Sequence, residues 1–88
     1  MPTINSINFP DNSRAIILEP QECHNPAIIR YDAERDIAVY SERLFLMSLT
    51  HCQGMTPSEA MEWYTYNTLG TNMRNYPVFI TEDGEEAL

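Results

Sequence analysis

The stretch from Thr56 to Gly70 constrains the fold most, because it carries both the start and the stop signal of a helix. Residues 56–59 read Thr-Pro-Ser-Glu, a capping box in which the threonine and glutamate side chains each accept a hydrogen bond from the other residue's backbone amide. Proline suits the first helical position, where no amide donor is needed. Gly70 then ends the pattern. We therefore predict a helix over residues 56–69.

A second helix is predicted just before it, over residues 41–52. Ser41 can accept from the free amides of a first helical turn, and Gly54 follows the end of the segment, where a left-handed residue commonly terminates a helix. Apolar and small side chains fall within one broad stripe of this helix: Leu44, Phe45, Ser48, Leu49 and Cys52. Two short helices joined by a brief loop form a helical hairpin.

The remaining apolar runs are short and β-branched, which predicts strands. We expect a strand at residues 14–19, a loop at 21–26, a hairpin of residues 27–32 and 36–40, and a last strand at 77–81. In the hairpin, Ala27, Ile29 and Tyr31 should share one face, and Ile37 and Val39 should share one face of the partner strand. The turn at residues 33–35 has no glycine, so its type stays open.

The element order is therefore β-β-β-α-α-β. The predicted class is α+β: a small antiparallel or mixed sheet with a two-helix hairpin packed on one face. A chain of 88 residues has room for one domain. Residues 1–13 should form an irregular arm that pins Ile4, Ile7 and Phe9 onto the body, and residues 82–88 an acidic, flexible tail.

The charge is lopsided and limits the classes of partner. There are 13 acidic and 5 basic residues, all five of them arginine, for a formal net charge of -8. Binding of nucleic acid or of an anionic membrane needs clustered cations, so neither is expected; mimicry of nucleic acid stays open. No apolar run approaches the roughly 20 residues of a membrane span, and residues 1–10 lack a secretion signal. We expect a cytoplasmic protein.

Two cysteine–histidine pairs, Cys23-His24 and His51-Cys52, are the only residues that suggest metal or thiol chemistry. Zinc accepts this ligand set, but adjacent ligands do not match the spacing of known zinc sites. Glu19 and Glu22 near Cys23 disfavour a reactive thiolate. We expect neither a metal nor another cofactor and no catalytic residue. A disulfide is conceivable, but a cytosolic setting favours free thiols.

The second predicted helix carries the candidate binding residues. Trp63 and Tyr66 can leave aromatic surface beside Glu62 and Glu59, and aromatic residues are favoured in protein interfaces. Asn67 falls within the apolar arc of the helix. A buried amide must find hydrogen-bond partners, so we predict that Asn67 is a structural clamp on a neighbouring loop or strand.

Residues 54–68, GMTPSEAMEWYTYNT, resemble a pattern in small proteins of bacteriophages and prophages. In that family a hairpin ending in Val-Tyr leads into a helix, then into a second helix of this type and a short strand after a proline; the matching parts here are residues 27–40, 41–52, 54–69 and 77–80. The hairpin turn departs from the pattern, since Glu34-Arg35 stands where glycine is usual. The resemblance implies a phage gene expressed in bacterial cytoplasm and assigns no functional residue.

These observations favour a non-enzymatic module that binds or inhibits a host or phage protein, including a host defence protein. Two alternatives stay open. One is a small metal- or thiol-dependent enzyme using Cys23, His24, His51 or Cys52. The other is a homodimer with a structural role, formed through the second helix or a sheet edge.

Overall fold

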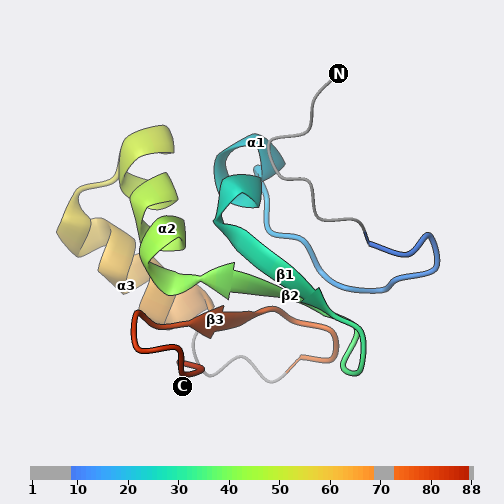
Figure 1. Cartoon of the computed structure of the whole chain (residues 1–88). Helices are drawn as coiled ribbons and strands as arrows, with labels where there is room; N and C mark the ends of the chain where they lie inside the picture. Colours follow the sequence, from blue (N-terminus) through green and yellow to red (C-terminus); the bar gives the residue numbers. More distant parts are fainter. Residues whose placement is uncertain (1–8, 69–72, 88) are drawn as a thin grey trace.

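The computed structural model describes residues 9–68 and 73–87. Figure 1 shows a small sheet with helices α2 and α3 to one side and α1 near the end of the α2 segment. In chain order the elements are α1 (Gln21–His24), the 3-10 helix η1 (Asn25–Ala27), β1 (Ile28–Asp32), β2 (Ile37–Ser41), α2 (Glu42–Met47), the π-helical turn η2 (Ser48–Cys52), α3 (Pro57–Asn67) and β3 (Val78–Ile80). The class is α+β, as predicted.

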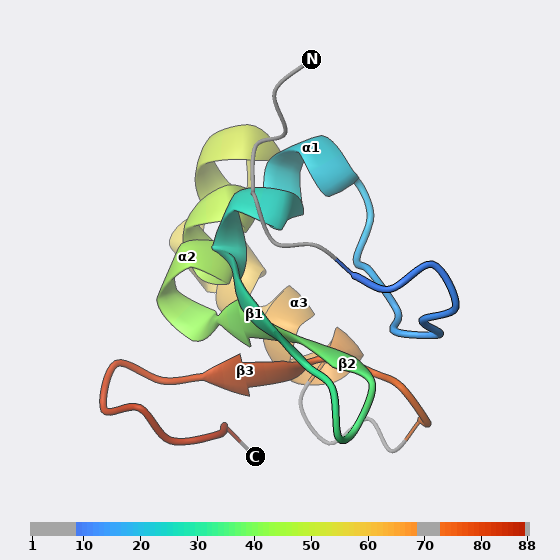
Figure 2. The same ribbon diagram turned by 45° about the vertical axis from the view of Figure 1, so that its right-hand side comes forward.

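The sheet has three strands in the order β1-β2-β3 and is mixed. β1 and β2 form the predicted antiparallel hairpin, with Tyr31 opposite Ala38, while β3 runs parallel to β2, with Tyr40 opposite Phe79. Figure 2 shows β2 between its two neighbours. A parallel neighbour needs a crossover, and here the helices α2 and α3 provide it.

The predicted first strand is wrong, and so is the β-β-β-α-α-β order. Residues 14–18 belong to no helix or strand, and the expected loop at 21–26 contains α1. The backbone amides of this segment find partners outside any ladder: Ile16 donates to the carbonyl of Asn75 (3.0 Å) and Leu18 to the hydroxyl of Tyr40 (3.0 Å). Ile17 and Leu18 still pack against the core.

The predicted inner face of β1 is also wrong. A register shift lies between Ile28 and Arg30, and such a bulge reverses the alternation of side chains. Ile28 is consequently buried, whereas Ile29 is 46% exposed. On β2, Ile37 and Val39 are both buried, but so are Ala38 and Tyr40, because this central strand is covered on both faces.

The hairpin turn is built around Asp36, which has φ +53°, a left-handed conformation that Asp tolerates better than most residues. Its carboxylate accepts hydrogen bonds from the Tyr31 hydroxyl (2.6 Å), the Ser13 hydroxyl (2.7 Å) and the Arg14 amide (2.9 Å). These donors, Tyr31 foremost, lower the pKa of Asp36. The turn therefore anchors the N-terminal arm instead of requiring glycine.

Both helix starts are confirmed. The Ser41 hydroxyl accepts from the Leu44 amide (3.2 Å). In the capping box, the Glu59 amide donates to the Thr56 hydroxyl (3.1 Å) and the Thr56 amide to the Glu59 carboxylate (2.9 Å). Gly54 has the expected positive φ of +77°. The other expected stop, Gly70, lies outside the described residues.

Phe45 of α2 lies at the centre of the core with none of its surface exposed. Its ring centroid is 5.1 Å from that of Phe79 on β3, and 5.9 Å and 6.1 Å from those of Tyr40 and Tyr64. The Tyr64 hydroxyl also donates to the Glu42 carboxylate (2.7 Å), which joins the first turn of α2 to α3. One aromatic cluster thus joins the helices to the sheet.

The described part of the tail lies against β3, and its flexibility stays a prediction. The Ala87 amide donates to the Phe79 carbonyl (2.8 Å), and Ile80 and Glu86 form an antiparallel bridge. The Glu86 carboxylate accepts from the Arg35 guanidinium (2.7 Å). At the other end, Phe9 packs edge-on against Tyr31, with centroids 4.9 Å apart; Ile4 and Ile7 lie outside the described residues. None of the described helices is long and apolar enough to cross a membrane.

Candidate functional site

The four side chains predicted to bind a partner lie on one face of α3. Glu59, Glu62, Trp63 and Tyr66 are spaced by three or four residues, which places them on one side of a helix. They line one surface pocket of about 380 Å³, and the loop before α3 supplies its other wall through Gly54 and Met55. We call this pocket the α3 hollow. Its loop wall was not foreseen from the sequence.

The two aromatic residues of the α3 hollow differ in exposure. Trp63 is half-buried and its ring centroid lies 6.0 Å from that of Phe45, so it packs against the core. Tyr66 is 80% exposed. One ring of the hollow is therefore anchored on the core, and the other lies almost entirely at the surface.

The charge of the α3 hollow is negative. Glu59 is held near the helix start by the Thr56 amide, and Glu62 is exposed. No basic residue is among the six that line the hollow. A second depression of about 540 Å³ shares Glu62 and Tyr66 and continues across the outer face of α3 to Met61. The acidic aromatic surface thus follows the helix beyond a single pocket.

The burial expected for Asn67 is wrong. Its residue is exposed, and its amide group donates to the Trp63 carbonyl in the preceding turn (2.9 Å). Thr68 occupies the inward position instead; it is 4% exposed, and its hydroxyl donates to the Tyr64 carbonyl. The Asn67 carbonyl accepts from the Tyr76 hydroxyl (2.8 Å), so the helix end is tied to the loop before β3. The stabilising role of the Asn67 side chain stays a prediction.

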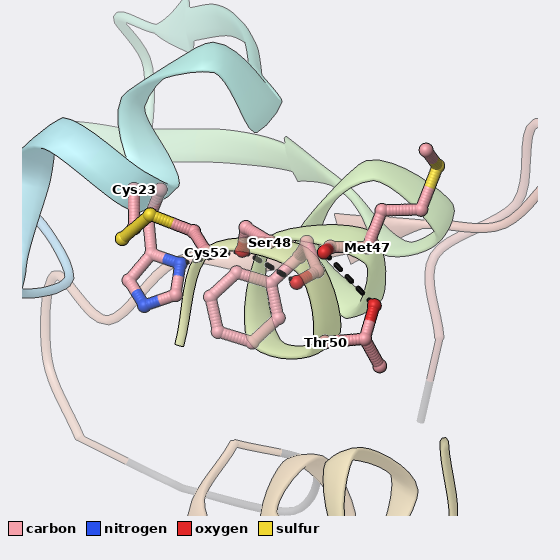
Figure 3. The surroundings of a disulfide bond; sticks show 7 residues. Cys23, Met47, Ser48, Thr50 and Cys52 are labelled. Atoms are coloured by element: carbon pink, nitrogen blue, oxygen red, sulfur yellow. Dashed lines mark hydrogen bonds between the residues drawn. A yellow bond between two sulfur atoms is a disulfide. The ribbon is translucent and has the colours of Figure 1, made fainter. Parts of the chain in front are cut away.

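The cysteines are not free thiols, which corrects that expectation. Cys23 of α1 and Cys52 at the end of η2 form a disulfide, with Cα atoms 5.7 Å apart (Figure 3). In residues 9–68 and 73–87, no three His, Cys, Asp or Glu side chains gather to hold a metal ion. The four predicted metal candidates are therefore split: two are joined to each other, His24 is buried, and His51 is exposed.

His24 is the least expected part of this region, because it is fully buried. The Ser48 hydroxyl donates to the Phe45 carbonyl (2.6 Å) and must therefore accept from Nδ1 of His24, which lies 2.6 Å away. This assigns the proton of the neutral ring to Nδ1. Within the described residues Nε2 makes no hydrogen bond of good geometry, although the Gln53 side chain lies nearby. Burial lowers the pKa of His24 more than Gln53 raises it.

The buried neutral His24 predicts a loss of stability in mild acid. Its pKa is lower in the folded chain than the value of about 6.5 in an unfolded one, so protons bind the unfolded chain more readily. This contribution is complete above pH 6.5 and is lost as the pH falls toward the folded pKa. Urea midpoints should decline between pH 7 and pH 5. In His24→Gln the decline over this interval should largely disappear; an equal slope in both proteins would contradict the prediction.

A second, mainly apolar groove lies between α2 and α3. It has a volume of about 320 Å³ and is lined by residues including Leu46, Met47 and Met61, with Arg43 at its side. Met47 and Met61 are 41% and 49% exposed. The hydrophobic pattern alone did not reveal this groove, since methionines at these positions are equally consistent with a packed core.

No protein-family model matches this chain, and the comparisons with curated proteins and with solved structures find no match to it. The function must therefore be argued from the geometry and charge of the α3 hollow.

Proposed function

We propose that this chain is a non-enzymatic protein-interaction module that binds a basic segment of a partner protein in the α3 hollow. The observation that carries the proposal is the convergence of Glu59, Glu62, Trp63 and Tyr66 on one pocket whose lining contains no cation. Carboxylates beside aromatic faces are the groups that recognise an arginine or lysine side chain.

The size and charge of the site agree with such a ligand. A hollow of about 380 Å³ accommodates one or two side chains, and the continuing depression past Met61 allows neighbouring residues of the partner to lie along α3. The net charge of -8 attracts a basic partner over a distance and speeds association at low salt. It also disfavours pairing of two copies, so a homodimer is the weaker alternative.

The resemblance to small phage proteins extends the proposal to the partner. We propose that the partner is a bacterial host protein, a class that includes defence proteins. Mimicry of nucleic acid by the acidic chain would select those host proteins that have a basic nucleic-acid-binding surface. The proposed cytoplasmic setting is opposed by the disulfide, because such bonds persist mainly in oxidising compartments. Thiol-dependent catalysis, the enzymatic alternative, would need Cys23 and Cys52 to be reduced first.

The proposal is tested with the only tryptophan of the chain, Trp63, as a fluorescent probe of the hollow. Titration with an arginine-rich peptide should change its emission and saturate, and a glutamate-rich peptide should not. Tyr66→Ala and Glu62→Gln should each weaken binding by about tenfold, the equivalent of 1.4 kcal/mol. Rising salt should weaken the wild-type interaction.

Glu34→Gln is the matched control, because it removes one exposed carboxylate from the hairpin turn, away from the hollow. Its affinity should stay close to that of the wild type. Equal losses in Glu62→Gln and Glu34→Gln would mean that only the net charge matters, and the α3 hollow would then not be the binding site.

A further inference from the structure

The Cys23–Cys52 disulfide joins one exposed residue to one half-buried residue. Cys52 is exposed and Cys23 is half-buried. Figure 3 shows the bond between α1 and the end of the η2 turn, with Ser48 beside it. Because Cys52 is the more exposed of the two residues, we take it as the side from which an external thiol approaches.

A surface pocket of about 380 Å³ lies against this bond. Its lining includes both cysteines, Pro26, Leu44, Met47 and His51. Leu44 is 36% exposed, so apolar surface is available directly beside the sulfur atoms. The His51 side chain contributes an imidazole to the lining, a group that acts as a proton acceptor in many proteins. The arrangement combines a reactive bond, a binding surface and a proton acceptor.

We propose that the disulfide is a thiol-exchange site that takes a neutral or cationic thiol, such as an aminothiol or a cysteine flanked by basic residues. The thiolate of the incoming molecule attacks Sγ of Cys52 and forms a new sulfur–sulfur bond there. The Cys23–Cys52 bond breaks, and Cys23 leaves as a thiolate that takes up a proton. One disulfide and one thiol are consumed and one of each is formed, so no further oxidant or reductant is needed.

The surrounding charge selects the thiol. Glu22 is exposed next to Cys23, and Glu19 is exposed before α1. The lining of the pocket holds neither a carboxylate nor an arginine, and Arg43 contacts Met47 at its side. The whole chain carries a net charge of -8. An anionic thiol such as glutathione is therefore repelled, and a cationic one is attracted.

The experiment exposes the native protein at neutral pH to equal concentrations of cysteamine, 2-mercaptoethanol or glutathione, and locates the adduct by mass spectrometry after acid quenching. Each rate is divided by the rate for the same chain unfolded in urea, which removes the intrinsic reactivity of each thiol. We expect adducts on Cys52 in at least tenfold excess over Cys23, and a normalised rate for cysteamine at least tenfold above that for glutathione.

Four variants test which side chains determine the rate of exchange and the preference for cysteamine. Glu22→Gln should reduce the preference for cysteamine several-fold, whereas Glu34→Gln should leave it unchanged. His51→Gln should slow exchange without moving the urea midpoint. Tyr66→Ala should exchange like the wild type, so the result stands apart from the outcome for the α3 hollow.

Two results would overturn the proposal. One is equal labelling of Cys23 and Cys52 in the native protein. The other is a rate of exchange that increases with low urea concentrations as global unfolding does, which would show that the bond reacts only when the chain unfolds.

Discussion

Replacing Phe45 with alanine is expected to lower the free energy of unfolding by about 3–5 kcal/mol. The side chain is fully buried and touches aromatic rings from three directions: Phe79 on β3, Tyr64 on α3 and His24 at the end of α1. Its removal leaves a cavity where helices and sheet meet, and the surrounding rings can fill it only in part. Urea unfolding followed by far-UV circular dichroism measures the loss.

Two controls make the Phe45 result interpretable. Phe45→Leu keeps most of the buried volume and should cost less than alanine, which provides a measurement if the alanine variant fails to fold. Met61→Ala removes a side chain that is 49% exposed and should change the stability by roughly 0.5 kcal/mol or less. A loss below about 1 kcal/mol for Phe45→Ala would show that the aromatic cluster does not hold the helices on the sheet.

Removal of the disulfide should have the second large effect. The double variant Cys23→Ser, Cys52→Ser frees a loop whose ends are 29 residues apart, and loop-closure entropy of this length corresponds to about 3–4 kcal/mol. The variant should unfold at a clearly lower urea concentration than the oxidised wild type, in the absence of reductant. Fully reduced wild type should fall near the variant, and reductant should not shift the variant itself. Coincident curves for variant and oxidised wild type would contradict a stabilising bond.

The parts of the fold that could be predicted are those specified by neighbouring residues. The capping box from Thr56 to Glu59 needs only four positions, and the start of α2 needs Ser41 and the amide three residues later. The hairpin of β1 and β2 follows from two β-branched runs separated by a short turn. Each signal is complete within one turn of helix or one hairpin, so no knowledge of tertiary structure is required.

The features that the sequence did not indicate depend on contacts between residues that are far apart in the chain. The run at residues 14–18 resembles a strand in sequence. Two of its backbone amides, however, donate to Tyr40 and Asn75 and not to a neighbouring strand. The tail contacts Arg35, which lies 51 positions from Glu86 in the sequence. The pairing of Cys23 with Cys52 depends on α1 lying against η2. No local pattern in the sequence indicates these long-range contacts.

The candidate site shows the same division. Helical spacing alone placed Glu59, Glu62 and Tyr66 together, and the α3 hollow does collect them. Its loop wall at Met55 depends on how the chain leaves η2. The helical spacing failed at Asn67, which is exposed, whereas Thr68 in the last turn of α3 is buried. Its backbone there departs from helical geometry, with φ -125°.

The fold-back of the tail has a consequence for how copies of this chain can associate. Residues 86 and 87 occupy the outer side of β3, whereas no strand of the described chain is paired to the outer side of β1. An edge strand with unpaired backbone groups is a template for further strands. Because residues 86 and 87 already pair with β3, a second copy cannot add a strand at that edge, and growth of the sheet in this direction ends at the tail.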